Sequence, residues 1–78
     1  MKTITLYTKS GCHLCELAEA TIDGLRDEHP FTLLRRDIGE DPADFDRYKH
    51  DVPVILVNGV EIARHRLTAD QLLAALDA

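Results

Sequence analysis

The sequence has few residues of several informative types: its 78 residues include no tryptophan, two cysteines, four glycines and three prolines. A secreted disulfide scaffold of this size usually carries at least ~4 cysteines, so the cysteine count argues against one. No internal repeat, low-complexity stretch or linker is visible. Residues 1–78 are therefore expected to form one domain, near the small end of what folds alone.

Long apolar runs are also missing. The longest nearly apolar run, Val52 to Val57, is far shorter than the ~20 residues that a membrane-spanning helix needs. The segment Met1 to Thr8 alternates apolar and polar residues, whereas a signal peptide needs an unbroken apolar stretch. These absences predict a cytoplasmic protein with neither a membrane segment nor a secretion signal.

Positive charge is scarce, because 9 Lys and Arg residues stand against 14 Asp and Glu residues, for a net charge of −5. No basic stripe is present, so binding to nucleic acid or to an anionic membrane is not expected. Apolar residues nevertheless make up 45% of the chain, which suits an aliphatic core and argues against disorder. We therefore predict a compact acidic domain and expect a monomer.

Hydrophobic periodicity and turn residues predict elements in the order β-α-β-α-β-β-α. The expected strands cover residues 3–8, 31–38, 52–57 and 60–64. The expected helices run over residues 12–27, through Ala43, Phe45 and Tyr48, and through Leu72, Leu73 and Leu76. We assign all four aromatic side chains to packing, with Phe31 and Phe45 in the core and Tyr7 and Tyr48 beside it.

Local signals mark the ends of these elements. Asp41 and Pro42 form an N-cap followed by a proline at the first helical position. Asn58-Gly59 is a strong hairpin signal, and Thr68 with Gln71 forms a capping box. A crossover helix between the first two strands makes them parallel, whereas the hairpin makes the last two antiparallel. The predicted fold is therefore α/β, with a mixed four-stranded sheet flanked by helices.

Cys12 and Cys15 carry the chemistry that the sequence predicts. Their C-x-x-C spacing falls at the start of the first predicted helix, where both side chains lie on one face. Unpaired N–H groups and the helix dipole stabilise a Cys12 thiolate, and a protonated His13 would lower the pKa of Cys12 further. Cys15 lies one turn further in, is better shielded and suits the resolving role.

The cysteine pair has two other interpretations. The two residues could be small buried hydrophobes, or half of a zinc site. Zinc would need two more ligands, yet the remaining histidines are scattered and form no H-x₃₋₅-H pair: His29, His50 and His65. A C-x-x-C motif inside a β-α-β pattern is typical of redox chemistry, which we favour.

The segment Leu6 to Cys15 resembles the active-site segment of glutaredoxins and of small glutaredoxin-like proteins. The step Val52-Pro53-Val54 is similar to the cis-proline segment of the wider thioredoxin-fold superfamily. The resemblance implies a thioredoxin fold over residues 1–78, with Cys12 as nucleophile and Cys15 as resolving thiol. It also implies a cis Pro53 beside the sulfurs and a Val52 backbone that binds a peptide or glutathione in strand fashion.

The sequence also departs from the family pattern. Lys9 matches the glutathione-binding lysine, but Ala63-Arg64-His65-Arg66 replaces the usual Gly-Gly-acidic segment. His13 replaces the usual proline of glutaredoxins. Gly11 and Leu6 stand where thioredoxins carry a tryptophan and a buried aspartate. The chain therefore resembles the glutaredoxin-like branch more than a standard glutaredoxin or thioredoxin.

The predicted fold brings three loops to one end of the sheet. These loops carry four Lys or Arg residues and three histidines: Lys9, His13, Lys49, His50, Arg64, His65 and Arg66. Their field would favour a thiolate and anionic partners; the alternative is that they are ordinary solvated charges. We expect Lys9, His13, Val52 and Pro53 to contact the substrate and expect no bound metal.

The leading prediction is a thiol–disulfide oxidoreductase that needs no bound cofactor. Its partners would be a disulfide-containing protein or glutathione, and its reductant would be glutathione or a thiol reductase. One alternative is an adaptor whose thiols serve a single partner. Another is an iron–sulfur or zinc carrier that uses Cys12 with an external thiol.

Overall fold

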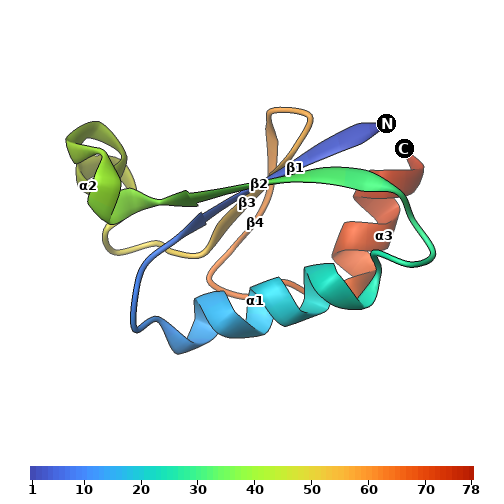
Figure 1. Cartoon of the computed structure of the whole chain (residues 1–78), viewed down its shortest axis with the longest axis horizontal. Helices are drawn as coiled ribbons and strands as arrows, with labels where there is room; N and C mark the ends of the chain where they lie inside the picture. The colour runs from blue at the N-terminus through green and yellow to red at the C-terminus, as the bar shows by residue number, and fades with distance from the viewer.

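The structure is a computed structural model that describes all residues, 1–78, as one sheet with helices around it (Figure 1). The strands are β1 (Lys2–Thr8), β2 (Phe31–Asp37), β3 (Val54–Val57) and β4 (Val60–Arg64). The helices are α1 (His13–Gly24), the short 3-10 helix η1 (Ile38–Glu40), α2 (Pro42–Tyr48) and α3 (Ala69–Asp77). The predicted order is confirmed, with η1 as an addition between β2 and α2.

The sheet has the strand order β2-β1-β3-β4. β1 pairs with β2 in parallel and with β3 in antiparallel fashion, and β3 and β4 form an antiparallel hairpin. Leu6 lies opposite Ile55 in this register, and both side chains are fully buried. Because a slip of one residue would turn them to the other face, the apolar pattern specifies the register.

Two hydrophobic clusters hold the layers together. In Figure 1, α1 and α3 lie along one side of the sheet, whereas α2 lies near its end, after β2. The larger cluster joins the sheet to α1 and α3 and contains Ile4, Leu6, Ala18, Ile22, Phe31, Ile55, Val57, Ala63 and Leu72. The smaller cluster lies at the end where α1 begins and contains Cys15, Ile38, Tyr48, Val52 and Val54. Cys15 is therefore part of the packed interior at that end, and Cys12 packs at its edge.

The predicted caps and turn are present. The Asp41 carboxylate accepts hydrogen bonds from two N–H groups at the start of α2, and Thr68 and Gln71 form the capping box of α3. Asn58 and Gly59 both have positive φ, 50° and 82°, as a two-residue hairpin turn of this kind requires. The predicted caps and the predicted hairpin turn are therefore confirmed.

Some boundaries and one burial prediction were wrong. α1 ends at Gly24 rather than near residue 27, because the Leu25 N–H bonds to the Ile22 carbonyl in a tighter turn. β3 begins at Val54 rather than at residue 52, since Pro53 has no N–H to donate to the ladder. Phe45 is 41% exposed rather than in the core, because the two-turn helix α2 buries Tyr48 instead. No helix combines the length and apolar content needed to span a membrane.

Candidate functional site

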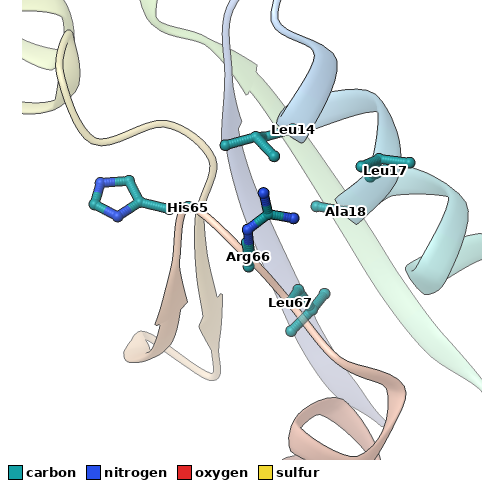
Figure 2. A pocket seen from close by; sticks show the side chains of 6 residues that line it. All are labelled: Leu14, Leu17, Ala18, His65, Arg66 and Leu67. Carbon is teal, nitrogen blue, oxygen red and sulfur yellow. The ribbon is translucent and has the colours of Figure 1, made fainter.

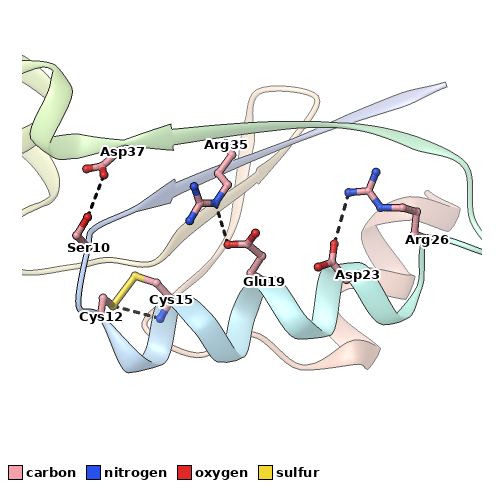
Figure 3. Close-up of polar contacts among 8 residues, drawn as sticks. All are labelled: Ser10, Cys12, Cys15, Glu19, Asp23, Arg26, Arg35 and Asp37. Atoms are coloured by element: carbon pink, nitrogen blue, oxygen red, sulfur yellow. Dashed lines mark hydrogen bonds and ion pairs between the residues drawn. A yellow bond between two sulfur atoms is a disulfide. The ribbon is translucent and has the colours of Figure 1, made fainter.

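The loop between β1 and α1 is held in shape at three points. The Cys12 N–H donates to the Lys9 carbonyl at 3.3 Å, and Gly11 has a φ of +76°, which a side chain would strain. The Ser10 hydroxyl donates to the Asp37 carboxylate at the end of β2, 3.4 Å away (Figure 3). The turn that presents the cysteines is therefore tied to the neighbouring strand.

Cys12 and Cys15 are joined as a disulfide at the start of α1 (Figure 3). Their Cα atoms are 5.2 Å apart, inside the range that disulfides span in proteins. Cys12 is the N-cap of the helix, and its sulfur accepts the Cys15 N–H at 3.1 Å. This N–H is one of the unpaired donors of the first turn, so the helix directs a hydrogen bond at the Cys12 sulfur.

The two sulfurs differ in exposure. Cys15 is only 2% exposed and packs in the smaller cluster, whereas Cys12 is partly exposed at its edge. An incoming sulfur atom therefore has access to Cys12 and not to Cys15. This arrangement has the asymmetry expected for one attacking and one resolving thiol.

The Val52–Pro53 segment packs beside the motif. The peptide bond between these residues is cis, as expected, and Val52 and Val54 belong to the same cluster as Cys15. The Pro53 carbonyl accepts the His65 N–H at 2.9 Å, which ties the segment to the end of β4. No backbone hydrogen bond outside the helices and strands involves Val52, so its peptide groups are free to pair with a ligand.

The basic end of the molecule, where the three loops with basic residues meet, has more of its positive charge neutralised by carboxylates than predicted. Arg64 contacts both Glu61, at 2.7 Å, and Asp51, at 3.3 Å, and His65 lies 3.1 Å from the same Asp51 carboxylate. The hydrogen bond from Arg64 lowers the pKa of Glu61 below its usual range and raises that of Arg64. Lys9, Lys49 and Arg66 form no ion pair, so they are the basic residues of these loops whose charge is best available to a ligand.

His13 lies where the sequence places it but faces solvent. Its imidazole is 3.7 Å from the Glu16 carboxylate, and the two side chains are 79% and 76% exposed. Water and this carboxylate screen the field of the ring at the Cys12 sulfur. The predicted electrostatic contribution of His13 is therefore weakened.

Sequence reasoning missed the residues that brace the motif from other elements. Asp37 anchors Ser10 from β2, and Arg35 on β2 pairs with Glu19 on α1 at 2.9 Å (Figure 3). The contact with Glu19 raises the pKa of Arg35 above its usual value. The pairing of β1 with β2, which sets Thr8 opposite Asp37, could have indicated only the contact between Ser10 and Asp37.

Comparison with known families gives a match over almost the whole chain. Residues 3–77 match the model of a family described as a glutaredoxin-like domain (DUF836). A curated relative, the glutaredoxin-like protein YDR286C homolog of Dictyostelium discoideum, is 32% identical over 80 residues. That alignment covers 95% of this chain and 74% of the relative.

Solved structures share the fold. Protein Ne2328 from Nitrosomonas europaea has a TM-score of 0.78 and 27% identity, over 94% of this chain and 88% of its own. Thioredoxin-2, described as a component of the malaria parasite protein secretion machinery, has a TM-score of 0.74 and 19% identity. That match covers 99% of this chain and 82% of thioredoxin-2. Together with the mixed sheet and its helices, these matches show a thioredoxin fold.

Proposed function

The chain belongs to the glutaredoxin-like domain family, and we propose that it is a thiol–disulfide oxidoreductase that reduces disulfides through Cys12 and Cys15. One observation carries the proposal: a partly exposed sulfur caps α1, next to a second sulfur that is buried. This arrangement supplies a stabilised thiolate for attack and a protected thiol for resolution.

The reaction proceeds in two exchanges. The Cys12 thiolate attacks one sulfur of the substrate disulfide, forming a mixed disulfide, and the other substrate half leaves as a thiolate that takes up a proton. Cys15 then loses its proton, and its sulfur attacks the Cys12 sulfur. The second substrate half is released as a thiol, leaving the Cys12–Cys15 disulfide that the structure shows. Two electrons and two protons pass to the substrate in each cycle.

The reverse half of the cycle needs a reductant. Two glutathione molecules, or the dithiol of a thiol reductase, would return two electrons and two protons to the cysteine pair. The protein needs no bound cofactor for either half, since the thiols carry the electrons. We therefore propose glutathione and disulfide-containing proteins as the partners of this protein.

Four further residues are proposed to contact the substrate. The free peptide groups of Val52 would pair with an extended substrate segment. The buried Pro53 would fix the position of these peptide groups beside the cysteine pair. Lys9 is exposed and free of ion pairs, so it can attract a carboxylate, whereas His13 would contribute only at the rim of the site.

Two serine variants test the assignment of the cysteines. Turnover of 2-hydroxyethyl disulfide, with glutathione or dithiothreitol as reductant, should be abolished in Cys12→Ser. Cys15→Ser should still form mixed disulfides at Cys12 but fail to resolve them through the dithiol route, so that mass spectrometry finds the adduct.

Other outcomes of this experiment would contradict the proposal. Full dithiol activity in Cys12→Ser would show that Cys12 is not the nucleophile. An active-site adduct without any turnover of a generic disulfide in the wild type would favour the single-partner adaptor. Metal or colour retained by freshly purified protein, and lost in Cys12→Ser, would favour the carrier.

A further inference from the structure

A small groove lies directly beside the cysteine motif, between α1 and the segment that joins β4 to α3 (Figure 2). Its volume is about 80 Å³, and it is lined by Leu14, Leu17, Ala18, His65, Arg66 and Leu67. Leu14 belongs to the C-x-x-C motif, and the His65 N–H bonds to the Pro53 carbonyl, so the groove adjoins both the motif and the cis-proline segment. Nothing in the proposed mechanism uses it.

The floor of the groove is apolar although it is open to water. Leu17 belongs to the apolar stripe of α1, yet its side chain is 47% exposed, whereas Ala18 beside it is buried. Leu14 and Leu67 are half-buried on either side. A single exposed leucine is ordinary on a protein surface. Here, however, three leucines line one concave site, and one of them, Leu14, is a residue of the cysteine motif itself.

The rim of the groove carries an unpaired positive charge. Arg66 forms no ion pair, whereas Arg26, Arg35 and Arg64 each contact a carboxylate. Figure 2 shows its guanidinium turned toward α1, while the His65 ring points away from the groove, consistent with its contact to Asp51. On a chain of net charge −5, this local cation selects an acidic group in whatever occupies the groove.

The size of the groove limits its occupant. It is smaller than the ~150 Å³ cavity that holds benzene, and far below the ~300–1,000 Å³ of typical small-molecule sites. It therefore suits one aliphatic side chain rather than a whole small ligand. Leu17 lies five positions after Cys12, roughly 7.5 Å along the helix, a distance that an extended chain spans in about two or three residues.

We propose that this groove binds protein substrates, taking an aliphatic side chain about two residues from the attacked cysteine and pairing an adjacent Asp or Glu with Arg66. The inference rests on the proposed function and specifies its substrate class: protein disulfides flanked by an aliphatic and an acidic residue. Leu14 and Leu17 supply the apolar contact, and Arg66 supplies the charge.

Peptide disulfides that differ at two positions test the inference. With dithiothreitol as reductant, kcat/KM of the wild type should be about fivefold higher for a Cys-Ala-Leu-Glu peptide than for Cys-Ala-Ser-Glu, since roughly half of a leucine side chain would be buried. Leu17→Ser should remove this preference. Leu34→Ser is the matched control, because Leu34 is similarly exposed, at 49%, but lies on the opposite face of the sheet.

A charge reversal tests the acidic half of the inference. Arg66→Glu should lower kcat/KM for Cys-Ala-Leu-Glu about two- to fivefold, as expected for an exposed ion pair, and raise it for Cys-Ala-Leu-Lys. Arg26→Glu changes the net charge equally but lies near the far end of α1, where Arg26 already pairs with Asp23. It should leave both rates nearly unchanged.

Reduction of the small neutral disulfide separates this inference from the proposed function. The four variants should all retain that reaction: Leu17→Ser, Leu34→Ser, Arg66→Glu and Arg26→Glu. Absence of the reaction in the wild type would refute the proposed function. If the reaction is present but Leu17→Ser and Leu34→Ser affect the peptides equally, the groove does not bind substrate. If Arg66→Glu slows a glutathione mixed disulfide as much as the acidic peptide, the groove recognises glutathione and the inference is wrong.

Discussion

Cys12 has a specific electrostatic setting, because its sulfur accepts the Cys15 N–H at 3.1 Å and caps the positive end of α1. In the reduced protein we therefore expect the pKa of Cys12 to lie below the ~8.5 of a free cysteine. The measurement is thiolate ultraviolet absorbance against pH in the Cys15→Ser variant, in which Cys12 is the only thiol. A midpoint at or above ~8.5 would show that the helix end does not activate this sulfur.

His13 provides the control for this prediction. Because its side chain is 79% exposed and faces Glu16, His13→Leu should shift the Cys12 midpoint only slightly. A large upward shift in that variant would show instead that the imidazole, and not the backbone of α1, is the main source of activation.

At the scale of the secondary-structure elements, α3 depends on its first turn. Thr68 accepts the Gln71 N–H while the Gln71 side chain accepts the Thr68 N–H, so two donors that the helix leaves unpaired are satisfied. Thr68→Ala should lower the free energy of unfolding by about 1 kcal/mol. For a domain of this size, the melting temperature measured by thermal unfolding should then fall by ~4–8 °C.

The matched control is a threonine inside a helix. Thr21 lies in α1, and its hydroxyl bonds only to the Leu17 carbonyl of the preceding turn. Thr21→Ala should therefore be neutral or slightly stabilising, because alanine has the higher helix propensity. Equal losses in both variants would mean that the capping box contributes nothing specific to α3.

At the scale of the whole molecule, two residues of the apolar stripe of α1, Leu17 and Ile22, have different roles. Ile22 is fully buried between α1 and the sheet, whereas Leu17 is 47% exposed. Ile22→Ala should lower the free energy of unfolding, measured in urea, by ~2–5 kcal/mol. This is a large part of the ~5–15 kcal/mol by which a typical domain is stable. Leu17→Ala should cost well under ~1 kcal/mol, since a surface change of this kind usually stays within about ±0.5 kcal/mol.

A comparable loss in both variants would contradict this division. It would mean that Leu17 is part of the folding core, and the groove beside the cysteine motif would then be structural. Retained stability in Leu17→Ala together with lost peptide preference in Leu17→Ser would support the division between core and binding surface.

The sequence alone determined what depends on neighbours along the chain. The spacing of Cys12 and Cys15, the caps at Asp41 and Thr68, and the turn at Asn58 each arise from a few consecutive residues. Such signals can be interpreted locally because one turn of helix or one hairpin contains all the partners. Together with the apolar periodicity, they were sufficient for the element order and the mixed sheet.

Only the tertiary structure decided what depends on residues far apart in the chain. Whether Phe45 or Tyr48 is buried depends on which side of α2 meets the sheet. The charge of the basic end depends on Asp51 meeting both Arg64 and His65. The groove exists because α1 passes the segment before α3. Exposure and ion pairing are properties of surfaces that form only when distant segments pack, so no local pattern specifies them.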